Sequence, residues 1–210
     1  STSSSDGLKR LCISLMNYGA AAQQYFGYKT DDLMNAFITE EQQALVSGYS
    51  DTMIPALGAA GDKAAPLAWT GGYSDISPSV NFGGALGINY NFTVTNTPDG
   101  DAKLYYWTAA DYEAAETLVL EEATGVLTAT DLGNGKYTTR VSGIAAKNGG
   151  DTVYVCIVYE SNGVVYRTGV LAYSVSTYCK TFANNPESSF QPMASLAAVY
   201  IYYANAYLAK

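Results

Sequence analysis

Residues 151–160 read "DTVYVCIVYE", a run dominated by alternating β-branched and aromatic residues that is typical of a β-strand. Turn-forming stretches such as "TPDGD", "DLGNG", "KNGGD" and "SNG" punctuate the surrounding chain. Between them lie five similar runs: "ALGINYNFTVTN" (85–96), "AKLYYWTA" (102–109), "ETLVLEEA" (116–123), "GKYTTRVSGI" (135–144) and "VVYRTGVLAYSV" (164–175). This pattern predicts an antiparallel β-sandwich of immunoglobulin-like type over residues 80–180.

The two ends of the chain carry helical patterns instead. Residues 8–26 place apolar side chains mostly three and four positions apart, and residues 188–210 are rich in alanine and tyrosine. Small residues at 19–22, Ala204 and Ala206 leave room for two helices to approach closely. We therefore expect the terminal helices to pair in a helical lobe, which makes the fold class α+β.

A chain of 210 residues is long enough for one well-buried core. We expect residues 1–7 to be a linker or an expression remnant, and residues 8–210 to form one two-lobed domain. The expected parts are a helical lobe (8–50 and 188–210), a connecting loop (51–79) and the β-sandwich (80–180). Within the helical lobe, Thr39 and Gln42 of "ITEEQQAL" have the spacing of a capping box.

Charge and residue content argue against several classes of function. The net charge is −8 and no stripe of Lys or Arg is present, so nucleic acid is not an expected partner, and no apolar run suggests membrane insertion. The chain has no histidine, which excludes His-dependent triads and zinc sites built on His. We expect no enzyme activity, no cofactor and no metal; a glycan-processing enzyme that uses carboxylates alone remains a third hypothesis.

Aromatic residues are the positive signal, with 19 Tyr, 6 Phe and 2 Trp. Such rings stack on the apolar faces of sugars while polar neighbours bond the sugar hydroxyls. The candidate carbohydrate-binding residues are Trp69 and Tyr73 in "LAWTGGYSD", and Trp107 and Tyr112 in "KLYYWTAADY". Trp69 is either a ligand platform or a plug between the lobes, and for Trp107 a core position is the preferred alternative.

Four phrases carry a family resemblance: "LMNYGAAAQQYFGYKTDDL", "YYWTAADYEAA", "VSGIAAKNGGDTVYV" and "LAYSVSTYCKTFANNP". From about residue 8 to 210 the chain resembles a module repeated in multimodular surface or secreted proteins of anaerobic gut bacteria. Those proteins often carry dockerins, leucine-rich repeats or carbohydrate-binding modules, and the chain is similar to the starch-adherence domains of amylosomes. No binding residue carries over by position.

The resemblance implies a non-catalytic polysaccharide-binding module with starch or another α-glucan as its first ligand. It also implies an extracellular location, on a bacterial cell surface or in a secreted complex, beside neighbouring modules of the same polypeptide. The alternative is a structural or adhesive spacer module with a protein partner. Solvent access to Trp69 and Trp107 separates the two hypotheses.

Overall fold

The structure is a computed structural model that describes residues 4–83 and 85–209. It divides into two compact units. The helical unit comprises Ser1–Ala56, Ala145–Gly150 and Val175–Lys210, and the sandwich unit comprises Leu57–Ile144 and Asp151–Ser174. Two antiparallel sheets together with helices confirm the α+β class.

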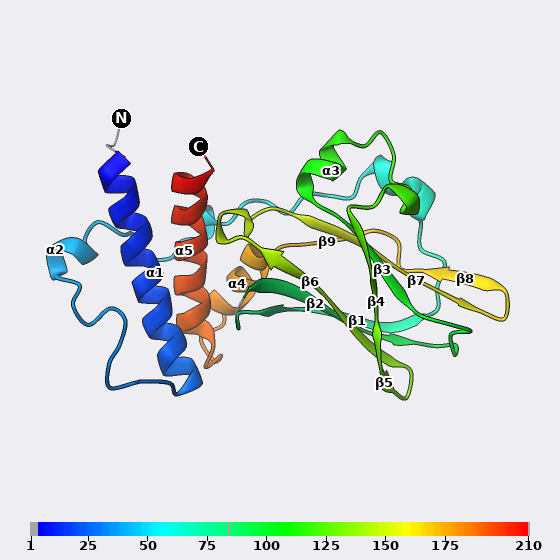
Figure 1. The fold of residues 1–210 in the computed structure, drawn as a ribbon, viewed down its shortest axis with the longest axis horizontal. Coiled ribbons are helices and arrows are strands. Elements are labelled where there is room, and N and C mark those ends of the chain that lie inside the picture. Colours follow the sequence, from blue (N-terminus) through cyan, green and yellow to red (C-terminus); the bar gives the residue numbers. More distant parts are fainter. Residues whose placement is uncertain (1–3, 84, 210) are drawn as a thin grey trace. The chain divides into compact units, whose positions relative to one another are not determined.

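Nine strands form the two sheets of the sandwich unit (Figure 1). The first sheet has the order β1-β2-β6-β5, with bounds Tyr73–Asn81, Leu86–Val94, Lys136–Ile144 and Thr130–Gly133. The second has the order β4-β3-β7-β8, with bounds Gly125–Thr128, Lys103–Trp107, Val153–Ser161 and Val164–Arg167; β9 (Leu171–Tyr173) also pairs with β7. Every pairing is antiparallel, as the hairpin turns predicted.

The long apolar run in β7 reflects a strand that is buried on both faces. One of its faces belongs to the interior of the sandwich. On the other face, Tyr154 and Cys156 join a second apolar cluster with Trp107, Ala64, Leu67, Tyr112 and Leu118. We call this set the Trp107 cluster. By contrast, β2 alternates buried Ile88, Tyr90 and Phe92 with partly exposed polar residues, because only one of its faces is covered.

Four α-helices build the helical unit: α1 (Ser4–Phe26), α2 (Glu40–Gln43), α4 (Val175–Ala183) and α5 (Gln191–Leu208). Helix α5 packs against both α1 and α4, and the rings of Tyr18 and Tyr200 stack with centroids 5.7 Å apart. The predicted capping box of α2 is confirmed by reciprocal bonds between Thr39 and Gln42. None of the described helices combines the length and the apolarity needed to cross a bilayer.

The small residues act differently from the expectation at two positions. A side chain at Gly19 would collide with the sulfur of Met34, so this glycine accommodates the segment that follows α1. Ala206 is exposed. Ala20, Ala21 and Ala204 are buried as expected, and α5 also buries Ala194, Ala197 and Ala198.

Several predicted boundaries are wrong. Helix α1 already begins at Ser4, within the residues that were expected to be a linker. The expected loop 51–79 contains two 3-10 turns, η1 (Asp51–Met53) and η2 (Asp62–Leu67), and the first seven residues of β1. Pro78 argued against a strand in the sequence. Because β1 is an edge strand, the missing N–H of Pro78 need not break the hydrogen bonds of the sheet. Residues 116–123 were expected to form a strand. Instead Leu118 is buried and a 3-10 turn, η3 (Leu120–Glu122), follows it. Residues 175–180 are helical rather than part of the sandwich.

Two short elements complete the chain. Helix α3 (Ala109–Ala114) follows β3 directly, and the side chain of Thr108 caps it by accepting a hydrogen bond from the backbone N–H of Asp111. The 3-10 turn η4 (Ala146–Asn148) lies in the helical unit and packs against α5. Asn205 of α5 donates to the carbonyl oxygen of Lys147 in that turn.

Candidate functional site

Trp69 lies on a short stretch of chain that extends the second sheet beyond β8. It forms an isolated antiparallel bridge with Thr168, and the backbone N–H of Thr70 donates to the carbonyl of Arg167 at 3.1 Å. The hydroxyl of Thr70 accepts from the N–H of Arg167 at 2.7 Å and donates to the carbonyl of Val165. The backbone under Trp69 is therefore held in place, while its indole is 51% exposed.

Gly71 and Gly72 carry the chain from this edge of the second sheet into β1 of the first. Both have φ near +90°, a conformation that L residues with a side chain rarely adopt. Gly72 also has no room for a Cβ, which would lie 2.6 Å from the hydroxyl of Tyr159. That hydroxyl donates to the Gly72 carbonyl, which also accepts from the N–H of Thr95.

This crossover delivers Tyr73 beside Trp69, with ring centroids 5.6 Å apart. Tyr73 in turn meets Phe92 of the first sheet and Tyr159 of the second, so its ring links the two sheets. The contacts continue from Tyr159 to Tyr166 and from Phe92 to Tyr137. We call these six rings the edge aromatic cluster: Trp69, Tyr73, Phe92, Tyr137, Tyr159 and Tyr166.

The hydroxyl of Tyr73 is used for structure. It donates to the carbonyl of Ile157 at 2.8 Å, and a longer contact reaches the carbonyl of Tyr166. Burial raises the pKa of this phenol well above its usual range, so the hydroxyl stays protonated and available as a donor. Of the two rings, the Trp69 indole is the one that offers an open face to solvent.

Trp107 and Tyr112 were selected as possible stacking residues, and burial excludes that role for both; for Trp107 it confirms the core position that the sequence favoured. Trp107 is 1% exposed and Tyr112 is 8% exposed. Tyr112 stacks on Tyr154 with centroids 3.8 Å apart, and its hydroxyl donates to the carbonyls of Ala59 and Ala60. Both side chains belong to the Trp107 cluster, so neither presents a face on which a sugar could stack.

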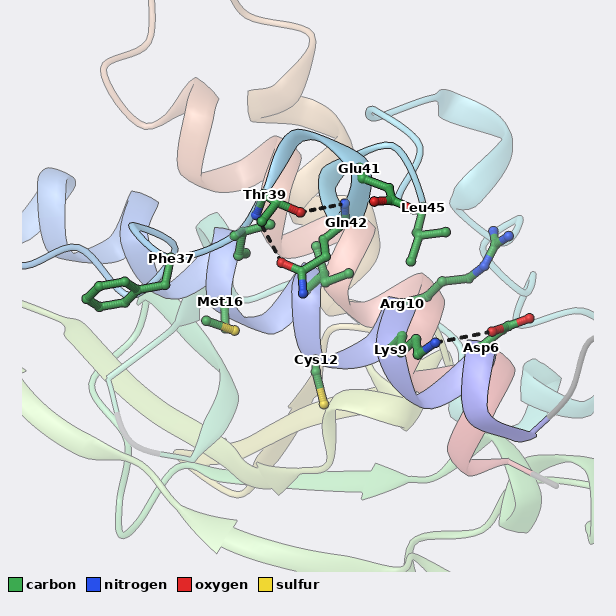
Figure 2. A pocket seen from close by; sticks show the side chains of 12 residues that line it. Asp6, Lys9, Arg10, Cys12, Met16, Phe37, Thr39, Glu41, Gln42 and Leu45 are labelled. Atoms are coloured by element: carbon green, nitrogen blue, oxygen red, sulfur yellow. Dashed lines mark hydrogen bonds and ion pairs between the residues drawn. The ribbon is translucent and has the colours of Figure 1, made fainter.

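A cavity of about 640 Å³ lies in the helical unit between α1 and residues 37–45 (Figure 2). Figure 2 shows Phe37 at one end of its lining and the ion pair between Lys9 and Asp6, 3.9 Å long, at the other. Phe37 is 86% exposed, and Cys12 is exposed as a free thiol. The remaining lining residues are Arg10, Ile13, Met16, Ile38, Thr39, Glu41, Gln42 and Leu45.

Sequence reasoning missed this cavity, because its walls come from α1 and from a segment of short turns. Asn17 on α1 anchors that segment by donating to Gln43 and accepting from Asn35. The available signal was Phe37, a large apolar residue two positions before the N-cap Thr39, which therefore lies outside helix α2. Two basic and two acidic side chains in the lining leave the cavity without a dominant charge.

Two carboxyl groups have lowered pKa values and two thiols have raised ones. Hydrogen bonds from Tyr49 and Asn184 lower the pKa of Asp51, and bonds from Thr108 and Thr124 lower that of Asp111, so both remain ionised at neutral pH. Burial raises the pKa of Cys156 to about 11 and that of Cys179 to about 12. Within residues 4–83 and 85–209, no group of three or more Asp, Glu and Cys side chains could hold a metal ion.

No protein-family model and no curated protein matches the chain. Among solved structures, the chain is similar to one described as "Crystal structure of Br derivative BhCBM56", with a TM-score of 0.32 and 18% sequence identity. That similarity covers 50% of this chain and 99% of the other.

Proposed function

We propose that the chain is a non-catalytic polysaccharide-binding module whose sandwich unit provides the binding surface. The observation that carries this proposal is the half-exposed Trp69, whose backbone pairs with Thr168 and is fixed by hydrogen bonds from Thr70 to Arg167 and Val165. A rigid indole loses little entropy when a sugar ring stacks on it.

The edge aromatic cluster supports this role because its other rings hold the Trp69 indole in position. Trp69 rests against Tyr73, whose ring and hydroxyl are both engaged within the sandwich unit. A binding residue held by such a supporting layer keeps its geometry when the ligand arrives. With a single open indole, affinity per module would be modest, and neighbouring modules of the same polypeptide would supply avidity.

Finer assignments rest on the sequence resemblance. They are starch or another α-glucan as ligand, and a place outside the cell, on a bacterial surface or in a secreted complex. We also infer that the sandwich is immunoglobulin-like. The sheet order β1-β2-β6-β5 corresponds to strands ABED of that fold, and β3-β7-β8 to strands CFG with β4 added beside C.

The test is depletion of the purified chain by insoluble starch, cellulose and xylan, repeated with Trp69→Ala. Phe37→Ala is the matched control, because Phe37 is also an exposed aromatic residue but lies in the helical unit. We expect depletion by one polysaccharide at least, lost in Trp69→Ala and kept in Phe37→Ala, with both variants folded by circular dichroism. Depletion by none of the three would contradict the proposal.

A second candidate, a structural or adhesive spacer with a protein partner, is favoured by the helical-unit cavity and the exposed ring of Phe37. Aromatic residues are enriched where proteins bind one another. A partner protein captured from the secreted fraction and identified by mass spectrometry should be lost with Phe37→Ala and retained with Trp69→Ala. The opposite pattern would remove the cavity as the partner site.

A further inference from the structure

The outward face of the β1-β2-β6-β5 sheet is built from hydroxyl, amide and charged side chains. On β2, the residues that alternate with the buried Ile88, Tyr90 and Phe92 are Asn89, Asn91 and Thr93. Their cross-strand partners are equally polar: Ser79, Ser77 and Asp75 on β1, and Arg140, Thr138 and Lys136 on β6. Such a face gains nothing from apolar burial and is suited to a ligand rich in hydroxyl groups.

Two rows of hydrogen bonds order these side chains across three strands. In one row, Asn89 donates to the hydroxyl of Ser79 at 3.3 Å and accepts from Nε of Arg140 at 2.6 Å. In the other, Asn91 accepts from the hydroxyl of Thr138 at 2.8 Å. The guanidinium of Arg140 is thus oriented by a strand neighbour although the residue is exposed.

A hollow of about 390 Å³ lies where β6 meets β4 and β5. Arg140, Thr128 and Thr130 are its exposed members, while Thr139 is buried and Leu127 is half-buried. Asn89 and Thr138 complete the lining. The hollow therefore combines one apolar side chain, several hydroxyls and one cation. These groups complement the C–H face, the hydroxyls and the carboxylate of an acidic sugar.

The cation of Arg140 is only partly used. Its Nε bonds Asn89, whereas its two terminal amino groups have no hydrogen-bond or ion-pair partner within the described residues. Lys136 lies on the same strand and face. Neither nearby carboxylate pairs with Arg140. Asp131 accepts a hydrogen bond from the N–H of Gly133, and Asp75 lies on β1, two strands away from β6.

We propose that this hollow is a subsite for a carboxylate-bearing sugar, a uronic acid residue of an acidic polysaccharide. The inference rests on the proposed function. It adds to the Trp69 platform, which stacks on neutral sugars, a second contact that selects a charged sugar. The free amino groups of Arg140 form a planar fork that matches a carboxylate with two parallel hydrogen bonds. The hydroxyls of Thr128, Thr130 and Thr138 bond the sugar hydroxyls, and Leu127 contacts the C–H face of the ring.

The first measurement is a titration of the ¹⁵N-labelled chain with sodium glucuronate, and with glucose as the neutral control. The side-chain Nε–H resonance of Arg140 should shift with glucuronate and stay in place with glucose. Absence of a glucuronate-specific shift would overturn the inference. Because free glucuronate needs no contact with Trp69, this result stands whether or not the chain binds a neutral polysaccharide.

The second measurement compares variants on polygalacturonate by affinity electrophoresis. Arg140→Gln should weaken binding about tenfold or more, because it removes the fork. Lys136→Gln, which deletes the same charge on the same face, should cost less than about threefold, since an exposed point charge contributes little. Equal effects of the two variants would mean general attraction of the anion and would overturn a built subsite.

The neutral polysaccharides separate this inference from the proposed function. Arg140→Gln should leave depletion by starch or xylan unchanged, whereas Trp69→Ala should remove it. Neutral binding without any response to glucuronate or polygalacturonate refutes the acidic subsite alone. A shifted Arg140 resonance without depletion by any neutral polysaccharide refutes the Trp69 platform alone.

Discussion

The two tryptophans of the sandwich unit occupy opposite environments, although each lies beside a tyrosine. Trp69 contacts Tyr73 and is half exposed, while Trp107 belongs to the cluster of Tyr112 and Tyr154 and is almost completely buried. The difference comes from one stretch of chain. Ala64 and Leu67 cover Trp107, and two residues later the same stretch places Trp69 in solvent.

The burial of Trp107 and the exposure of Trp69 therefore depend on the same segment of chain. The stretch 57–67 is tied down by Lys63, whose ammonium donates to the carbonyls of Tyr112 and Glu113, and by the hydroxyl of Tyr112. The next residues continue into the bridge beside β8. Loss of the Trp107 cluster should therefore also release the Trp69 platform, whereas the reverse should not hold.

The largest expected effect belongs to Trp107→Ala. Removing a fully buried indole leaves a cavity among Leu67, Leu118 and Cys156, and such changes cost about 3–5 kcal/mol. The free energy of unfolding in urea, followed by far-UV circular dichroism, measures this loss. Trp69→Ala is the matched comparison and should cost less than about 1 kcal/mol, as an exposed position does. Equal losses would mean that Trp69 is also a core residue.

Gly72→Ala should have the next largest effect. The new methyl would meet the hydroxyl of Tyr159 and the ring of Tyr166 in a backbone conformation that already disfavours a side chain, at a cost of about 2–4 kcal/mol. Gly71→Ala shares the positive φ but points into open space, so it should cost about 1–2 kcal/mol. Thermal melting of the two variants compares them. A smaller loss for Gly72→Ala than for Gly71→Ala would contradict the packing of the crossover.

Tyr73→Phe should have a smaller effect, because it keeps the ring and removes only the donor to Ile157. The expected loss is about 1 kcal/mol in urea unfolding. Polysaccharide depletion should be unchanged, since the support of Trp69 by the ring persists. If depletion disappears in a folded Tyr73→Phe variant, the hydroxyl contacts the glycan and its structural assignment is wrong.

Ionisation of the Cys156 thiol should leave the stability unchanged at neutral pH and lower it at high pH. Its pKa is raised by burial from an ordinary value of 9.0 to about 11. The unfolded chain thus loses this proton first as the pH rises, and the stability contribution is present below pH 9 and lost between pH 9 and about 11. Urea midpoints at pH 8 and pH 10 should fall less in Cys156→Ala than in the parent chain. An identical fall in both would show that this thiol does not contribute.

Much of the fold followed from local pattern, because hairpin turns and strand composition are encoded within a few residues. The antiparallel strands, the capping box at Thr39 and the cap at Thr108 were all predictable. Strand β1 was not, since Pro78 and its serines resemble a loop until the pairing with β2 is known. Residues 116–123 were wrongly predicted to form a strand, because Leu118 packs against the second sheet while its N–H bonds the carbonyl of Lys63 in a distant segment.

The candidate site was harder to predict, since exposure depends on contacts far apart in sequence. The core position preferred for Trp107 is confirmed, but the residues that cover it, Ala64 and Leu67, lie about forty positions earlier in the sequence. For Trp69 the sequence left a ligand platform and a buried plug equally open. The polar hollow at Arg140 was also invisible, because its walls come from four strands whose register only the folded sheet sets.

The bridge that positions Trp69 also protects the sheet. An unpaired strand edge invites pairing with other chains, and natural proteins shield such edges. Residues 69 and 70 occupy the outer side of β8, and at the other sheet the edge strand β1 carries Pro78. A ligand cannot pull Trp69 out of place without uncovering the β8 edge. The same two residues therefore shield the sheet edge from aggregation and hold the proposed binding surface in place.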